Sequence, residues 1–146
     1  MSAILVVDDQ PDIRELLKTI LSLRDFEVTE ASGGPKALEF LDAGESYDLI
    51  LLDVQMPEMD GWDTLHAIRE RYGELGPRVV LCTVKGHPRD LIHGWMLGCD
   101  GYVWKPFDLN AIIEEVNTVL SREAQDRIRV RRNAISEAEG MLRAVT

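Results

Sequence analysis

The sequence predicts an α/β protein with a doubly wound, five-stranded parallel sheet. Short apolar runs, such as residues 4–7 and 49–52, have the composition of strands that are buried on both faces. Stretches with apolar residues at helical spacing follow these runs, as in residues 11–24. Strand-like and helix-like segments alternate five times along the chain, which predicts βα units with helices on both faces of one sheet.

Local signals set the expected limits of each element. Pro11 suits the first turn of a helix, and Gly98 suits a helix end. The pair Asp60-Gly61 precedes a helical pattern, and Asp108 is the expected cap of the helix over 109–120. The expected strands are 4–7, 26–31, 49–52, 78–83 and 101–104, and the expected helices are 33–43, 61–72, 88–97 and 109–120 in addition to 11–24.

Length and charge suggest one domain with an appendage. The chain has 146 residues and a net charge of −10, yet residues 121–146 carry more arginines than acidic residues. This shift suggests a domain over 1–120 and a helical extension or tail over 121–146. The acidic body disfavours nonspecific nucleic-acid binding. No apolar run approaches the roughly 20 residues that span a bilayer, and the N-terminus lacks a secretion signal. We therefore expect a cytoplasmic protein without membrane association.

Polar residues follow four of the expected strands, at the sheet edge where ligands bind in such folds. Asp8 and Asp9 follow the first strand, Asp53 the third, Thr83 the fourth and Lys105 the fifth. Three converging carboxylates would repel one another unless a hard dication such as Mg²⁺ shared them. With a lysine charge and a threonine hydroxyl added, the set suits phosphoryl transfer to an aspartate.

Three segments, which contain all of these residues except Thr83, resemble the signature of two-component response-regulator receiver domains. They are residues 6–9 (VVDD), 51–61 (LLDVQMPEMDG) and 98–107 (GCDGYVWKPF). The resemblance covers about residues 3–120, and the five polar positions occur in the family's order. It implies a flavodoxin-like fold with strand order 2-1-3-4-5 and five helices.

The resemblance also implies a role for each acidic residue. Asp53 is the phosphoacceptor, in a reaction that needs Mg²⁺ or Mn²⁺. Asp9 binds the metal directly, Asp8 supports it partly through water, and Asp53 and the backbone carbonyl of Gln55 are further ligands. The phosphoryl donor implied is a sensor histidine kinase or a phosphotransfer protein, and an unidentified downstream protein reads the result.

Three further roles follow from the same resemblance. Lys105 pairs with Asp53 and then with the phosphoryl oxygens, and a cis bond joins it to Pro106. Thr83 bonds the phosphoryl group. Tyr102 is the aromatic switch, which turns inward after phosphorylation.

Taken one at a time, several of these residues have plainer interpretations. Asp8 and Asp9 could cap the helix that begins at Pro11, Thr83 could simply end a strand, and Tyr102 could be a core residue. Asp53 is harder to explain in this way, because a carboxylate directly after apolar strand residues needs a partner. The joint occurrence of the set favours the functional interpretation.

Other residues near the site depart from the family pattern or vary within it. Val84 stands where the family usually has alanine or glycine, and it would narrow access to the phosphoryl group. Gln55 and Lys85 lie at variable positions and would tune the lifetime of the phosphoryl group. Trp95 and Trp104 either add bulk near the output face or pack in the core.

The extension carries a heptad-like stripe. It predicts a helix that either continues the last receiver helix as one rod or forms a frayed tail, although Arg131 and Gly140 weaken it. The stripe consists of Ala124, Ile128, Arg131, Ile135, Ala138, Leu142 and Val145.

An exposed apolar stripe would favour a homodimer through the last receiver helix and the extension. The arginines of the extension, at positions 127, 129, 131 and 132, are expected on a solvated face or against a protein partner. We expect no direct DNA binding, because 26 residues are too few for a typical three-helix DNA-binding domain.

Three classes of function compete: a phosphorylated signalling switch, an aspartyl-phosphate hydrolase, and a receiver that never turns over phosphate. Haloacid-dehalogenase-like phosphatases place a second acid two residues after the nucleophile, where this chain has Gln55. The complete set of acids, threonine and lysine argues against an inert receiver. The sequence therefore favours a phosphoacceptor signalling domain over an enzyme.

Overall fold

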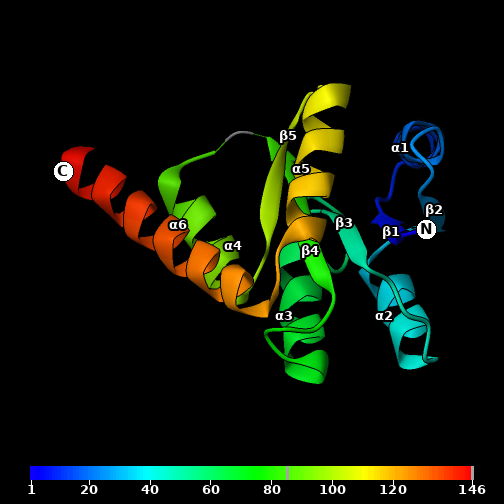
Figure 1. Cartoon of the computed structure of the whole chain (residues 1–146), viewed down its shortest axis with the longest axis horizontal. Helices are drawn as coiled ribbons and strands as arrows, with labels where there is room; N and C mark the ends of the chain where they lie inside the picture. The colour runs from blue at the N-terminus through cyan, green and yellow to red at the C-terminus, as the bar shows by residue number, and fades with distance from the viewer. Residues whose placement is uncertain (85, 146) are drawn as a thin grey trace.

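The computed structural model describes residues 1–84 and 86–145, and its five parallel strands lie in the order β2-β1-β3-β4-β5. This confirms the predicted topology. Five helices alternate with the strands, and a sixth follows the fifth (Figure 1). The strands are β1 (Ala3–Val7), β2 (Glu27–Ala31), β3 (Leu49–Asp53), β4 (Arg78–Val84) and β5 (Gly101–Lys105), and the helices are α1 (Pro11–Ser22), α2 (Gly34–Asp42), α3 (Gly61–Tyr72), α4 (Pro88–Leu97), α5 (Leu109–Ser121) and α6 (Ala124–Val145).

Alternate residues of the central strands supply two separate cores, one on each face of the sheet. Leu5 and Leu52 point to the face covered by α2, α3 and α4. Ile4 and Leu51 point to the opposite face, which α1 and α5 cover. Both faces are therefore buried, which explains why these strands are apolar throughout.

The helix ends carry the capping groups that the sequence suggested, with one exception. The side chain of Asp108 accepts hydrogen bonds from two backbone N–H groups at the start of α5, and Gly98 ends α4 in the left-handed conformation with φ of 99°. At α1 the N-cap residue is Gln10, which makes no side-chain cap bond. The plainer interpretation of Asp8 and Asp9 as an N-cap is therefore wrong.

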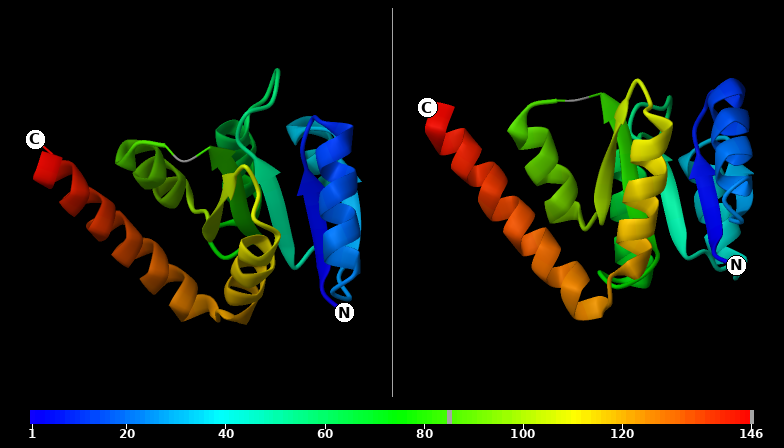
Figure 2. Two further views of the ribbon diagram at one scale, coloured as in Figure 1. Left: turned by 90° about the horizontal axis from the view of Figure 1, so that it is seen from above. Right: turned by 45° about the horizontal axis from the view of Figure 1, so that its top comes forward.

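The extension forms a separate helix, so the continuous rod is wrong. Arg122, between α5 and α6, has an extended backbone with ψ of 133°, which ends α5 and turns the chain. Figure 2 shows α6 leaving the end of α5 at an angle and running along α4. Along the described part of the chain, no helix is long and apolar enough to cross a membrane.

The docking of α6 also corrects the expectation for its arginines. Arg127 and Arg131 are only 4% and 7% exposed, whereas Arg129 is exposed as expected. The helix turns these two arginines, together with Ala138, toward the rest of the domain.

Candidate phosphorylation site

The carboxyl ends of β1 and β3 place the acidic residues side by side. In the parallel register Val7 lies beside Leu52, so the next residues, Asp8 and Asp53, end adjacent strands. Asp53 in turn lies beside Cys82 of β4. The register of the strands is therefore enough to bring the carboxylates together at one edge of the sheet.

The carboxylates of Asp8, Asp9 and Asp53 form the predicted cluster. Each offers an oxygen, and these oxygens lie within 4.8 Å of one another. Asp8 and Asp53 are each only 2% exposed, while Asp9 is open to solvent. Buried carboxylates at this separation need a compensating charge, and the exposed third acid leaves a path for an ion to enter. The donor set therefore fits a hard dication with oxygen ligands.

Lys105 supplies part of the compensating charge. Its Nζ lies 2.7 Å from Oδ1 of Asp53 and 3.9 Å from Oδ2 of Asp8. Burial lowers the pKa of Lys105, but the hydrogen bond and the charge of Asp53 outweigh that effect and leave the pKa raised. The lysine is therefore a permanent cation at the site.

The fold shifts the pKa of Asp8 upward. Burial raises its pKa above the ordinary 3.8, and the charge of Asp53 adds to the rise, while a hydrogen bond from the backbone N–H of Gln10 opposes it. That bond measures 2.9 Å. The single charge of Lys105 does not balance three carboxylates, so a bound dication would reduce the repulsion between them.

Gln55 and Thr83 flank Asp53. The backbone N–H of Gln55 donates to Oδ1 of Asp53 at 3.3 Å, while the metal role of the Gln55 carbonyl stays a prediction. Thr83, the residue after the β4 partner of Asp53, is half-buried and lines a cavity of about 410 Å³. Val84 lines the same cavity and is exposed, and Lys85 lies outside the described residues.

Tyr102 lies away from the carboxylates, on the face of the sheet that α4 covers. It is only 9% exposed, and its hydroxyl donates to the backbone carbonyls of Asp90 and Leu91 at 3.1 and 3.2 Å. Its ring stacks on Trp104 and meets Trp95 edge-on. The inward position assigned to the phosphorylated state is thus already present in this structure. Thr83 and Tyr102 line one cavity, and their roles as switch residues stay predictions.

A thiol and a cis peptide bond lie beside the carboxylates, and neither is a reactive group. The thiol of Cys82 lies next to Asp53, and burial raises its pKa to about 12, with the charge of Asp53 adding to the rise. It is therefore a neutral packing group. The Lys105–Pro106 bond is cis, as the family resemblance implied.

The sequence did not predict a buried charged cluster at the start of β5, the opposite end of that strand from Lys105. Asp100 is 2% exposed and binds arginines from α3 and α6. The available signal was the four-residue spacing of Arg127 and Arg131, which places both on one face of a helix.

Comparisons with known proteins agree with this site. Residues 4–117 match the response regulator receiver domain. The chain is 38% identical to the transcriptional regulatory protein CpxR of Escherichia coli K12 over 122 residues, which are 84% of this chain and 50% of that protein. It is 39% identical to the transcriptional regulatory protein SrrA of Staphylococcus aureus, over 82% of this chain and 48% of that protein. The chain thus spans about half the length of the curated relatives it matches.

Solved structures give the same result. TrrA of Thermotoga maritima, a response regulator solved in complex with Mg²⁺-BeF, superposes with a TM-score of 0.72 at 36% identity, covering 82% of this chain and 99% of that one. The chemotaxis response regulator CheY4 of Vibrio cholerae superposes with a TM-score of 0.75 at 28% identity, covering 82% and 98%.

The chain therefore belongs to the response regulator receiver family, the phosphoacceptor signalling domains of two-component systems. Its acidic cluster of Asp8, Asp9 and Asp53 is the family's site for phosphorylation, and receiver domains are phosphorylated by histidine kinases. Such a domain is a signalling module rather than a conventional enzyme.

Proposed function

We propose that Asp53 accepts a phosphoryl group and that the resulting aspartyl phosphate switches the binding of a protein partner. The observation that carries the proposal is the position of Asp53, which is buried beside two acids and bonded to Lys105 at 2.7 Å. A carboxylate held in this way is both poised as a nucleophile and shielded from bulk water.

The residues divide the transfer step between them. A carboxylate oxygen of Asp53 attacks phosphorus, the bond from phosphorus to the donor's nitrogen or oxygen breaks, and the leaving group keeps that electron pair. Lys105 moves from the carboxylate to an oxygen of the phosphoryl group, and the Thr83 hydroxyl donates to another. Mg²⁺ held by Asp8, Asp9, Asp53 and the Gln55 carbonyl would neutralise the charge that gathers in the transition state.

Two findings support Mg²⁺ as the metal. The oxygen-only donor set is the kind that Mg²⁺ prefers, and the similar TrrA structure contains Mg²⁺-BeF. A histidine kinase or a phosphotransfer protein is the expected donor. The partner that reads the signal is expected to be a protein rather than DNA, in keeping with the net charge of −10.

A homodimer through α5 and α6 stays a prediction. In this structure α6 packs along α4, so a dimer would use the outer face of α6 or require α6 to leave α4. Sedimentation of the whole chain, with and without a phosphoryl mimic, measures this directly.

Intact-mass measurement with Mg²⁺ and acetyl phosphate tests the main proposal. The wild-type chain should gain one phosphoryl mass, and Asp53→Asn should gain none. Asp12→Asn, which removes an exposed carboxylate on the nearby first turn of α1, should behave like wild type. Stoichiometric labelling of Asp53→Asn would falsify the assignment. Rapid phosphate release with no detectable intermediate would instead indicate a hydrolase, and neither signal would indicate an inert receiver.

A further inference from the structure

Asp100, between α4 and β5, joins α6 to the body of the domain. Its carboxylate is bound by Arg127 at 2.8 Å, by Arg131 at 3.0 Å and by Arg69 of α3 at 3.1 Å. It also accepts from the backbone N–H of Val79 at 2.9 Å. Both carboxylate oxygens of Asp100 therefore accept hydrogen bonds from other elements. Two of the three arginines come from α6.

Backbone carbonyls complete the attachment of α6. These carbonyls lie just after the C-terminal ends of α3 and α4, where the helix dipole is negative, so they offset the excess of arginine charge around one carboxylate. Arg131 donates to the carbonyls of Cys99 at 2.9 Å and Glu74 at 2.7 Å, and Arg127 donates to those of Leu75 at 3.2 Å and Gly76 at 3.0 Å.

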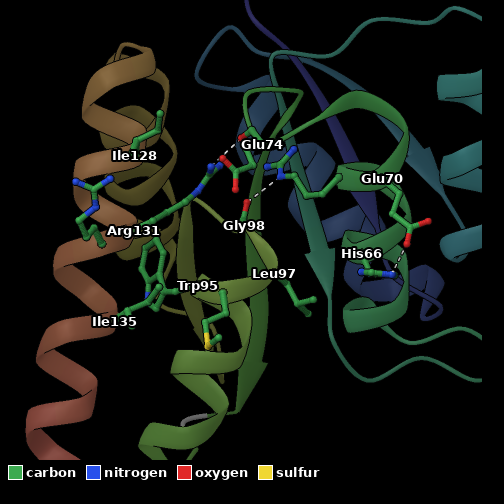
Figure 3. Close-up of a pocket in the computed structure, with 12 residues that line it drawn as sticks. His66, Glu70, Glu74, Trp95, Leu97, Gly98, Ile128, Arg131 and Ile135 are labelled. Carbon is green, nitrogen blue, oxygen red and sulfur yellow. Dashed lines mark hydrogen bonds and ion pairs between the residues drawn. The ribbon is translucent and has the colours of Figure 1, made fainter.

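Trp95 of α4 connects this attachment to Tyr102. Figure 3 shows Trp95 against α6, beside Ile135 and Arg131, where these side chains line a groove of about 560 Å³. On its other side the Trp95 ring meets Tyr102 edge-on, with the ring centroids 5.8 Å apart. Tyr102 lines the cavity that also contains Thr83. The phosphorylation site and α6 are therefore linked through a cavity that Thr83 and Tyr102 line and through the ring contact of Tyr102 with Trp95.

We propose that docking of α6 on α4 is coupled to the occupancy of Asp53. Phosphorylation then changes how tightly α6 docks, and the docking of α6 changes how strongly the site binds a phosphoryl group. This inference rests on the proposed function. A phosphoryl group that draws the Thr83 hydroxyl toward Asp53 enlarges the cavity on the side of Tyr102. It thereby favours the buried position of the Tyr102 ring, which is the position that packs against Trp95 in this structure.

The coupling has a defined sign. A ligand shifts an equilibrium only by its differential affinity for the two states, and coupling between two sites is reciprocal. Because the docked α6 is found together with the buried Tyr102, occupancy of Asp53 should tighten α6. For the same reason, loosening α6 should weaken binding at Asp53.

The experiment uses the whole chain with Mg²⁺ and beryllium fluoride as a phosphoryl mimic. Binding is followed by ¹⁹F NMR of the bound fluoride, and the docking of α6 by amide hydrogen exchange across residues 124–145. Saturation of the wild type should slow exchange in α6 by about fivefold or more.

Two variants and a control test reciprocity. Arg131→Ala should accelerate exchange in α6 and raise the half-saturating beryllium fluoride concentration by about fivefold. Ile135→Ala, which leaves the Asp100 cluster intact, should act in the same direction more weakly and serves if the first variant is poorly folded. Arg129→Ala removes an arginine that is 66% exposed and paired with Asp126 on the same helix, so it should match wild type.

The outcomes separate the two proposals. Absence of saturable binding to wild type overturns the proposed function and this coupling with it. Saturable binding with unchanged exchange in α6 overturns the coupling alone. The same holds if both α6 variants loosen the helix and yet bind beryllium fluoride as tightly as wild type.

Discussion

At the scale of single residues, the two acids that follow β1 differ in kind although they are neighbours in sequence. Asp8 is buried and its pKa is raised, chiefly by burial, whereas Asp9 is open to solvent. The same carboxylate chemistry therefore has different consequences at the two positions. We expect removal of Asp8 to change mainly the stability of the metal-free fold, and removal of Asp9 to change mainly the affinity for a metal ion.

Asp9→Ala should weaken Mg²⁺ binding by about tenfold or more and leave the free energy of unfolding nearly unchanged. The physical reason is that an exposed side chain adds a ligand without adding burial. Titration of Mg²⁺ against tryptophan fluorescence measures the affinity, and Asp12→Asn is the matched control. An unchanged Mg²⁺ affinity would remove Asp9 from the ligand set.

Asp8→Asn should stabilise the metal-free protein at neutral pH. The folded-state pKa of Asp8 lies above its unfolded value near 3.8, so the wild type loses stability as pH rises from that value through the folded pKa. The variant lacks this loss, and the two proteins should converge at lower pH, where Asp8 is protonated in both states. Thermal unfolding in EDTA across that range checks the sign.

Saturating Mg²⁺ should reverse that order, because the dication stabilises the wild-type carboxylate and the variant offers only a neutral amide. If the wild type is the more stable protein even in EDTA, burial of Asp8 is not an electrostatic cost.

The convergence of these residues could be predicted from sequence, because the strand ends of a parallel sheet meet at one edge. Asp8, Asp53 and Lys105 follow continuous apolar runs, so their convergence needed only the topology. Sequence could not show that Asp9 points to solvent, or that Tyr102 already lies inward. Both depend on side-chain packing around α4 and the loop after β1.

At the scale of elements, the fit between α4 and β5 depends on one glycine. A Cβ on Gly94 would overlap the hydroxyl of Tyr102 and lie 3.0 Å from Leu81. Glycine therefore allows the tyrosine to reach the carbonyls of Asp90 and Leu91 on the inner side of α4. The sequence pattern of α4 gave no warning of this, since the requirement comes from a partner strand.

Gly94→Ala should destabilise the fold by about 1–3 kcal/mol, the usual cost of overpacking. Denaturant unfolding measures the loss. Adding Tyr102→Phe should recover part of it, because the hydroxyl is the closest obstacle. Gly140→Ala in α6 is the control: its nearest heavy atom would be 3.9 Å away, so alanine should stabilise that helix by up to about 1 kcal/mol. Additive effects of the Gly94 and Tyr102 changes would contradict the proposed overlap.

At the scale of the whole molecule, α6 shows where sequence reasoning failed and why. The stripe of the extension correctly indicated a helix, and the limits of the strands and helices that precede it were predicted to within two residues. The direction of α6 was not predictable, because it depends on the extended backbone at Arg122 and on a buried acid 27 residues away from Arg127. An arginine in a stripe is normally taken as solvated, and only a buried counter-charge reverses that expectation.

Asp100→Asn should therefore cost far more than a surface carboxylate. Removing one member of a buried ionic cluster leaves the others uncompensated, and such losses are typically about 3–5 kcal/mol. Here three arginines would lose their shared carboxylate, and their bonds to backbone carbonyls would offset only part of the loss. Because two of the arginines belong to α6, we expect that helix to loosen before the sheet does. Chemical denaturation gives the total loss, and hydrogen exchange of residues 124–145 locates it.

Asp42→Asn is the matched control, since Asp42 pairs with Arg71 and Tyr72 at the surface and should matter little. If Asp100→Asn unfolds like the control, α6 is held by its apolar contacts with α4 and the charged cluster is incidental to its docking.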